Sequence, residues 1–366
     1  MGKKVVSLLL AGFMALSLAA CGSTGTGSAS GSAAQQSGSA SASTSGAALE
    51  DTVVVYTTHS EAMLEEIAAA FTEKTGVQVE FINLKGELAD RVRGEMKNPQ
   101  ADIMYGGDTA TYMLLKDEGA YTASNPSWGG DLDSAFKDGY GFWYGTIQTP
   151  VMLFYNTEQL SAADAPKDWG DLADAKYAGK IVSRDSLSSS MRSTICNLMY
   201  FYSQQNGEDS ALEYLAALDT NTKSYYSSGS MMFEAIGKGE AAISFGVLSD
   251  ITTNRDENGM PLEIIDAASG SVVITDCIAA LKDSPHPAAA QAFLEFAGSA
   301  EVQTMLANDF NRMPTLKAAL ANSPAWMQTG YAAMDVDWSA IAANQSDWLS
   351  NWETNICNAD KAVASK

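Results

Sequence analysis

The sequence predicts an α/β fold of two lobes, each a mostly parallel sheet flanked by helices, joined by two crossover strands. Three observations lead to this prediction. Strand-like runs followed by a polar turn and a helical pattern recur along the chain, which is typical of parallel sheets. Two long strand-like runs bracket the middle third. The 366 residues are enough for two lobes with separate cores.

The N-terminus is interpreted as a secretion signal and a tether. Residues 1–20 contain two lysines, Lys3 and Lys4, and continue as an uncharged apolar run, which at about 16 residues suits a signal peptide better than a membrane span. The run ends in small residues before Cys21. This resembles the lipobox of bacterial lipoproteins, so we expect Cys21 to be lipidated; a plain signal peptide is the alternative. Residues 21–49 are rich in Gly, Ser and Ala and predict a disordered tether.

Composition limits the classes of partner. Without residues 1–20 the chain keeps 20 basic and 44 acidic side chains, a formal charge of −24, which argues against nucleic-acid binding. A cleft can still carry a local positive field, so an anionic ligand stays open. No later stretch is long and apolar enough for a membrane span. Cys196, Cys277 and Cys357 fit no metal or redox spacing and predict buried free thiols, with one disulfide as the alternative.

Residues 50–152 are expected to form the first part of lobe 1. Residues 51–56 are a β-branched run, and residues 61–74 have helical spacing of apolar side chains. Gly76 then ends the helix, since glycine readily takes the left-handed conformation there. Residues 77–82 predict the next strand and residues 101–105 another. This is a β-α-β start with polar loops at the strand ends.

The two crossovers are predicted at residues 142–156 and 270–280, which are long and apolar. They assign residues 153–273 to lobe 2, and residues 274–366 to the return into lobe 1 and the C-terminal helices. In lobe 2 the strand, turn and helix pattern recurs after residues 181 and 242. Ligands of parallel sheets lie beyond the carboxyl ends of the strands.

Five segments, in order, resemble the bacterial extracellular solute-binding proteins with the type II periplasmic-binding-protein fold. The closest branch is that of the ferric-ion, phosphonate and sugar-phosphate receptors. The segments are VVVYTTHSE, VMLFYNTEQL, APKDWGDLADAKYAGKIVSRD, YYSSGSMMFEAIGKGEAAISFG and DSPHPAAAQAFLEFAGSAEVQTML.

The resemblance implies a monomeric receptor without a cofactor, which closes on a small ligand and delivers it to an ABC permease driven by an ATPase. With a lipidated Cys21, it would be held on the outer face of the cell membrane, or in the periplasm of a two-membrane cell.

The candidate binding residues lie in loops where strands meet helices. Hydroxyls and backbone N–H groups at helix starts suit an anion such as a phosphate, phosphonate or carboxylate. Simple helix capping is the alternative for each loop. The candidates are Thr57, Thr58, His59, Ser60, Ser188, Ser189, Ser190, Ser228, Gly229 and Ser230.

Charged candidates are fewer. Asp108 and Asp250 close strand-end loops and are expected to bind hydroxyl or amino groups, with capping or solvent exposure as alternatives. Arg184 or Arg312 could bind an anionic group through two hydrogen bonds, or form a surface ion pair.

Iron and catalysis are the competing interpretations. Ferric receptors of this branch use adjacent tyrosines, and Tyr225–Tyr226 is such a pair, but it lies earlier than the family's pair, so we expect no metal site. A secreted hydrolase is the remaining alternative. The fragments Ser134–Lys137 and Lys74–Gly76 match serine β-lactamase motifs in the reverse order, and no nucleophile motif surrounds His59 or His286.

Overall fold

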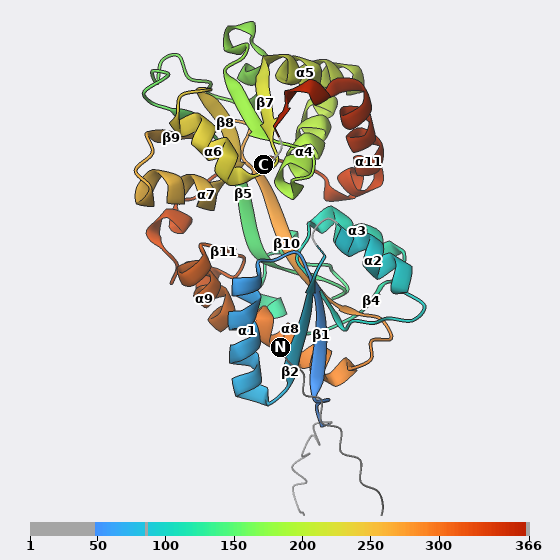
Figure 1. The fold of residues 1–366 in the computed structure, drawn as a ribbon. Helices are drawn as coiled ribbons and strands as arrows, with labels where there is room; N and C mark the ends of the chain where they lie inside the picture. The colour runs from blue at the N-terminus through green and yellow to red at the C-terminus, as the bar shows by residue number, and fades with distance from the viewer. Residues whose placement is uncertain (1–47, 85–86, 364–366) are drawn as a thin grey trace, which may run out of the picture. The chain divides into compact units, whose positions relative to one another are not determined.

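The computed structural model describes residues 48–84 and 87–363, so the expected signal peptide, Cys21 and nearly all of the tether lie outside the described residues. The described chain is an α/β structure of two lobes linked by long strands (Figure 1), which confirms the predicted fold class. No helix within these ranges combines the length and apolarity needed to cross a bilayer. The strands are β1 (Thr52–Thr57), β2 (Gln78–Asn83), β3 (Ile103–Tyr105), β4 (Tyr121–Thr122), β5 (Tyr144–Asn156), β6 (Ile181–Arg184), β7 (Thr222–Tyr226), β8 (Ile243–Val247), β9 (Leu262–Ile265), β10 (Val272–Leu281), β11 (Met313–Pro314) and β12 (Ala362–Val363).

The helices follow the strands in the order expected for parallel units. In lobe 1, α1 ends at Gly76, which has a φ of 80° and donates its N–H to the Thr72 carbonyl, as the sequence predicts. The α-helices are α1 (Glu61–Thr75), α2 (Leu88–Glu95), α3 (Thr109–Asp117), α4 (Ser189–Asn206), α5 (Glu208–Asn221), α6 (Gly229–Gly237), α7 (Leu248–Thr252), α8 (Pro287–Ala297), α9 (Ala300–Phe310), α10 (Lys317–Leu320) and α11 (Trp338–Asn351).

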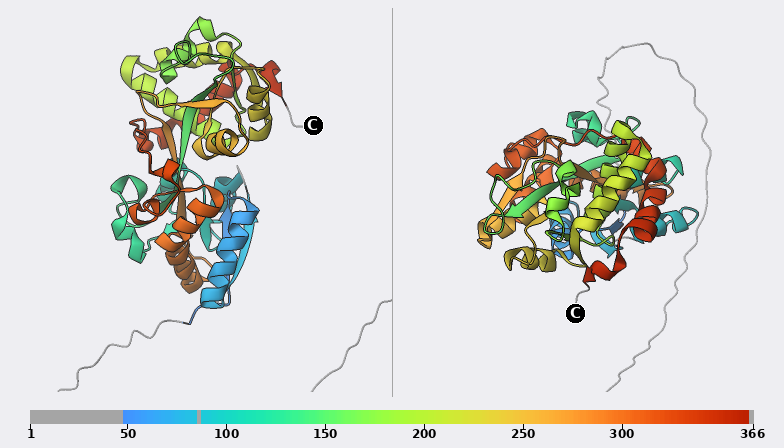
Figure 2. Two further views of the ribbon diagram at one scale, coloured as in Figure 1. Left: turned by 90° about the vertical axis from the view of Figure 1, so that its left-hand side faces the viewer. Right: turned by 90° about the horizontal axis from the view of Figure 1, so that it is seen from above.

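The two crossover strands, β5 and β10, run through both lobes (Figure 2). They pair antiparallel over residues 144–151 and 272–278, with Val272 opposite Val151 and a register shift at Asp276 and Cys277. Because they continue from one lobe into the other, the sheet has a single strand order: β12-β7-β6-β8-β5-β10-β3-β1-β2. The pairs β1 with β2 and β3 in lobe 1, and β6 with β7 and β8 in lobe 2, are parallel. The crossovers are antiparallel to their neighbours, β10 to β3 and β5 to β8.

Apolar side chains cover both faces of the sheet in each lobe. In lobe 1, Phe71 of α1 packs edge-on against Phe293 of α8 with ring centroids 5.2 Å apart, while α2 and α3 cover the other face. In lobe 2, Trp169 and Trp352 are buried on one face, and α6 covers the other. These buried layers therefore build two lobes, which are joined by the crossovers and by further contacts such as that between α11 and α3.

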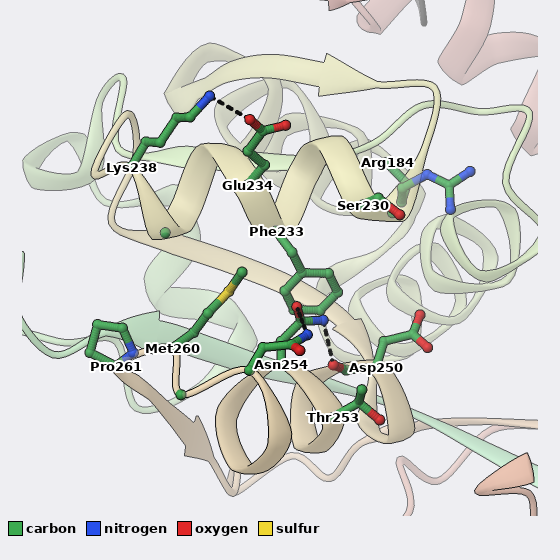
Figure 3. Close-up of a pocket in the computed structure, with 14 residues that line it drawn as sticks. Arg184, Ser230, Phe233, Glu234, Lys238, Asp250, Thr253, Asn254, Met260 and Pro261 are labelled. Atoms are coloured by element: carbon green, nitrogen blue, oxygen red, sulfur yellow. Dashed lines mark hydrogen bonds and ion pairs between the residues drawn. The ribbon is translucent and has the colours of Figure 1, made fainter.

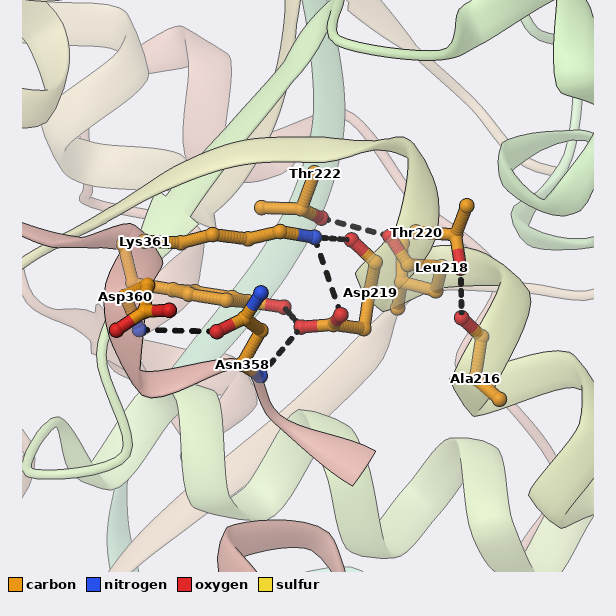
Figure 4. A network of polar contacts seen from close by, with 9 residues as sticks. Ala216, Leu218, Asp219, Thr220, Thr222, Asn358, Asp360 and Lys361 are labelled. Atoms are coloured by element: carbon orange, nitrogen blue, oxygen red, sulfur yellow. Dashed lines mark hydrogen bonds and ion pairs between the residues drawn. The ribbon is translucent and has the colours of Figure 1, made fainter. Parts of the chain in front are cut away.

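The C-terminal segment packs on lobe 2, where β12 pairs with β7. Asp219 anchors this segment (Figure 4). Its carboxylate accepts hydrogen bonds from the Tyr225 hydroxyl at 2.8 Å and the Asn358 backbone at 3.0 Å, and it pairs with Lys361 at 3.0 Å. One carboxylate therefore ties the chain end to β7 and α5.

Candidate ligand-binding cleft

The loop after β1 forms the first wall of the cleft. Thr57 is fully buried, and its hydroxyl accepts a hydrogen bond from the His59 N–H at 3.1 Å, which sets the shape of the loop. Thr58 lines a cavity between the lobes. Ser60 precedes α1 and is exposed, and its side chain does not cap the helix. Of these hydroxyls, that of Thr58 therefore faces the cavity.

His59 is 7% exposed, and its Nε2 has no hydrogen-bond partner within the described residues. The ring stands edge-on to Tyr105, with ring centroids 4.5 Å apart. Burial, followed by the positive charge of Arg312, lowers the pKa of His59 to about 3. The imidazole is therefore neutral at neutral pH.

The loop after β3 requires glycine at Gly106. This residue has a φ of 97°, and a Cβ there would overlap the Thr58 hydroxyl and lie 3.2 Å from His59 Nε2. Asp108 follows and caps α3 by accepting the Thr111 N–H at 2.9 Å. Its other oxygen accepts the Ser193 hydroxyl of α4 at 3.1 Å, which connects the two lobes. Asp108 is thus both a helix cap, the alternative foreseen from the sequence, and a lining residue of the cavity.

Lobe 2 contributes two serine loops at helix starts. Ser188 precedes α4, and its hydroxyl lies 2.9 Å from that of Ser190; Ser189 lines the cavity between the lobes. Ser228 caps α6 by accepting the Met231 N–H at 3.2 Å. Gly229 and Ser230 line a second hollow beside that cap.

Two cavities occupy this region. The first has a volume of about 830 Å³ and runs between α6 and α7 on lobe 2, with Arg184, Ser230 and Asp250 towards one end (Figure 3). The second measures about 420 Å³ and lies between the lobes, where Thr58 and Asp108 face Ser189 and Ser193. Of the ligand-binding residues expected from the sequence, these two cavities are lined by Thr58, Asp108, Ser189, Gly229, Ser230 and Asp250.

Two arginines in this region carry no ion pair. Arg91, Arg93, Arg192 and Arg255 each contact a carboxylate within 4.0 Å. The Arg184 guanidinium instead donates to the carbonyls of Tyr226 at 3.2 Å and Ser227 at 3.0 Å. The Nε of Arg312 is buried without a hydrogen-bond partner within the described chain.

Arg312 occupies the hinge. It follows α9 and lines a small hollow with Thr149 of β5 and Ser249 of lobe 2. Its charge lowers the pKa of His59 in lobe 1 and opposes the rise in the pKa of Asp250 in lobe 2. One guanidinium therefore lies within electrostatic range of both walls of the cleft.

The carboxylates of the cleft are not neutralised by close cations. Burial raises the pKa of Asp250, although Arg312 and Arg184 oppose the shift. Burial also raises the pKa of Asp276 to about 6, where hydrogen bonding and Arg312 oppose the rise and Asp108 adds to it. Asp276 was not among the residues expected from the sequence; the available signal was a single carboxylate in a strand whose other side chains, apart from Thr275, are apolar.

The hydroxyls of Tyr225 and Tyr226 are directed at carboxylates. They lie in β7, where the Tyr225 hydroxyl donates to Asp219 at 2.8 Å and the Tyr226 hydroxyl to Glu240 at 3.4 Å. No group of three or more His, Cys, Asp or Glu side chains in the described ranges could hold a metal ion. The described cysteines are free, with Cys196 and Cys277 buried and Cys357 half-buried.

The hydrolase motifs have structural roles. Lys74 pairs with Glu301 at 2.8 Å, and Lys137 donates to the Gly129 carbonyl at 2.7 Å. The ring nitrogen Nδ1 of His286 lies 2.9 Å from the carboxylate oxygen Oδ2 of buried Asp102. The same carboxylate accepts hydrogen bonds from the backbone N–H groups of Val54 and His286. These contacts hold loops and helix starts in place.

Known proteins share this architecture. A "Probable ABC transporter periplasmic-binding protein y4fP" of Sinorhizobium fredii is 31% identical over 84% of this chain and 87% of its own length. The apo ferric ion-binding protein A of Pasteurella haemolytica superposes with a TM-score of 0.74 at 19% identity, over 83% of this chain and 97% of that one. The fructose-6-phosphate-bound AfuA of Actinobacillus pleuropneumoniae gives 0.71 at 24% identity, over 84% and 99%.

The family model described as "Bacterial extracellular solute-binding protein" matches residues 66–334. The relatives are solute-binding proteins of extracellular or periplasmic location and not enzymes. The protein is therefore the substrate-binding component of an ABC importer, with a small-molecule ligand and an ABC permease as its partners. The chain belongs to the bacterial extracellular solute-binding protein family.

Proposed function

We propose that this receptor captures a small solute with a phosphate, phosphonate or similar anionic group, and closes its lobes on it. The observation that carries the proposal is the pair of arginines without an ion pair, Arg184 and Arg312, in a chain whose other described arginines all have one. An uncompensated guanidinium in a cleft is the group best suited to bind an anion through two hydrogen bonds. AfuA, a structural neighbour, holds fructose-6-phosphate.

Hinge closure would complete the site. Thr58 and His59 belong to lobe 1, Ser189 and Ser230 to lobe 2, and Arg312 lies beside the crossovers. A ligand that contacts both lobes favours the closed state by the difference between its affinities for the two states. We further propose that the receptor works as a monomer, anchored outside the membrane by a lipid on Cys21.

Ferric iron is the second candidate, because a structural neighbour is a ferric ion-binding protein. The tyrosine contacts argue against it. Phenolate ligands need hydroxyls that are free to face a metal, whereas those of Tyr225 and Tyr226 are directed at Asp219 and Glu240. Burial and Asp219 also raise the pKa of Tyr225, which disfavours the phenolate.

The test is thermal-shift and calorimetric screening of the purified chain against sugar phosphates, phosphonates, carboxylates and Fe(III). Arg184→Gln and Arg312→Gln should each weaken anion binding about 10-fold or more, since a charge-assisted hydrogen bond contributes about 1.5–3 kcal/mol. Arg255→Gln, which removes a surface arginine paired with Asp256, is the matched control and should bind normally. Stabilisation by iron alone, lost in Tyr225→Phe or Tyr226→Phe, would refute the anion proposal.

A further inference from the structure

Leu187 projects from the wall that lobe 2 presents to lobe 1. Its side chain is 86% exposed, more than any other large apolar side chain of the described residues. The loop that carries it is held by hydrogen bonds: the Asp185 carboxylate accepts the Leu187 N–H at 3.2 Å, and the Asp185 carbonyl accepts the Ser188 N–H at 3.1 Å. A single exposed leucine is ordinary in a folded protein, so its significance depends on what it faces.

The opposite wall of the same cavity is apolar. The cavity of about 420 Å³ between the lobes is lined by Leu187 on lobe 2 and by Leu88, Ala89 and Leu114 on lobe 1. Leu88 is buried, whereas Ala89 of α2 and Leu114 of α3 are half-buried. The loop before α4 therefore faces α2 and α3 across a space that closure of the lobes would shorten (Figure 1).

Two further contacts show that the lobes already meet on this flank of the cleft. One turn into α4, the Ser193 hydroxyl donates to Asp108, the N-cap of α3, at 3.1 Å. Next to that cap, Ala110 of α3 is fully buried in the same apolar cluster as Ile195 of α4. The inner part of the flank is therefore packed, and Leu187 lies at its exposed edge. A rotation of one lobe about the packed part moves that edge furthest.

The charges on the two walls are largely compensated within each lobe. On lobe 1, Arg93 pairs with Asp90 at 3.0 Å and with Glu118 at 2.7 Å. On lobe 2, Arg192 pairs with Glu353 at 3.2 Å. Exposed pairs of this kind interact only weakly with other charges across water. The apolar side chains therefore dominate the contact that closure would make here.

We propose that Leu187 docks on Ala89 and Leu114 when the lobes close, and so stabilises the closed state without touching the ligand. Removing the leucine side chain from water favours the state that buries it. Because the contact exists only in the closed state, it lowers the apparent dissociation constant of every ligand by the same factor. This inference rests on the hinge closure of the proposed function, and it does not depend on the charge of the ligand.

Disulfide trapping tests the contact directly and requires no ligand. The purified full chain carries Leu187→Cys and Ala89→Cys, with Cys357→Ser to remove the half-buried thiol, and mild oxidation is followed by mass-spectrometric mapping. Two cysteines form a bridge only when their Cα atoms come within about 7 Å. We expect a bridge between positions 187 and 89 to accumulate in the unliganded chain through transient closure.

The matched control for the bridge pairs Leu187→Cys with Asp117→Cys. Asp117 is exposed at the far end of the helix that Asp108 caps, so this pair should stay unbridged. No bridge between positions 187 and 89, or equal bridging in the two pairs, would overturn the inference.

Calorimetry and urea unfolding separate a closure contact from a structural role. Leu187→Ser should bind inorganic phosphate, methylphosphonate and fructose-6-phosphate more weakly by one common factor of about 10. Its unliganded stability should stay unchanged, because the side chain is 86% exposed. Leu187→Met keeps an apolar side chain and should bind normally. Tyr140→Ser, which removes an 80% exposed side chain outside this cavity, should also bind normally.

The outcomes distinguish this inference from the proposed function. Unchanged affinity in Leu187→Ser, or a loss confined to one probe, would overturn the inference and leave the anion proposal standing. Failure of all three probes to bind the unmodified chain would count against the anion proposal, while the disulfide result would still decide whether Leu187 docks on lobe 1.

Discussion

Asp276 provides a test of the cleft that requires no ligand. Its pKa in the folded chain is raised from 3.8 to about 6, mainly by burial. One pKa unit corresponds to about 1.4 kcal/mol, so ionised Asp276 destabilises the unliganded fold by about 3 kcal/mol as an upper bound. Asp276→Asn removes the charge and keeps an oxygen for Thr149. Because the neutral amide avoids the cost of burying a charge, we expect a gain in unfolding free energy of roughly 1–3 kcal/mol at pH 7.5.

The pH dependence identifies the cause of the gain. An acid whose folded pKa is raised holds its proton longer when folded, so stability falls as the pH rises from about 4 to about 6. The advantage of Asp276→Asn should therefore be full above pH 6 and largely absent near pH 4. Urea unfolding of the unliganded protein at both pH values measures it, with Asp117→Asn as a control that should change stability by less than about 0.5 kcal/mol. A substitution that destabilises at pH 7.5, or an equal gain at both pH values, would refute this account.

Three further predictions concern the loops, the chain end and the thiols. Gly106→Ala and Gly119→Ala both place a side chain at positive φ, but Gly119 has open space around its Cβ position. Calorimetry with the best anionic probe should therefore show a loss of affinity for Gly106→Ala alone. Equal affinities of the two variants would contradict the loop geometry. Asp219→Asn should lower the unfolding free energy by roughly 1–3 kcal/mol because Lys361 and Tyr225 lose a charged acceptor, which urea unfolding can measure. Iodoacetamide mapped by mass spectrometry should label Cys357 before the other two described thiols; earlier labelling of a buried one would contradict the packing.

The sequence predicted the elements whose patterns are local. The alternation and branching of residues 52–57, the apolar face of α1 and the stop at Gly76 all lie within a few residues of one another. The crossover strands were found for the same reason, since each is a long apolar run. Both crossovers are central strands buried on both faces, and in such strands nearly every position is apolar.

The elements that were missed depend on distant partners. Strand β12 is only Ala362–Val363, and it exists because β7 offers a free edge there. Strand β7 itself contains Tyr225 and Tyr226, which were considered as a possible metal pair. Its β-branched and aromatic composition was a usable signal for a strand, but the hydroxyl partners Asp219 and Glu240 could not be known from spacing.

The candidate site was predictable in outline. Parallel topology places strand-end loops at a common edge, so loops containing Thr58, Asp108, Ser189 and Ser230 could be expected at the cleft. The choice between ligand contact and ion pair for Arg184 and Arg312 could not be made, because the ion-pair partners of the other arginines come from helices and loops that the sequence does not place. Asp276 was missed because a strand that crosses between lobes reads as core.

The features that break local rules occur together at this cleft. His59 and Arg312 leave buried polar atoms without partners, and Asp276 is held in an environment that disfavours its charge. A fold selected for stability alone would remove such costs, since each orphaned polar group destabilises by about 1–3 kcal/mol. A ligand that satisfies these groups recovers that free energy on binding. The substitutions that stabilise the unliganded protein should therefore also lower its affinity for the ligand. This opposite effect on stability and affinity distinguishes a binding site from a packing defect.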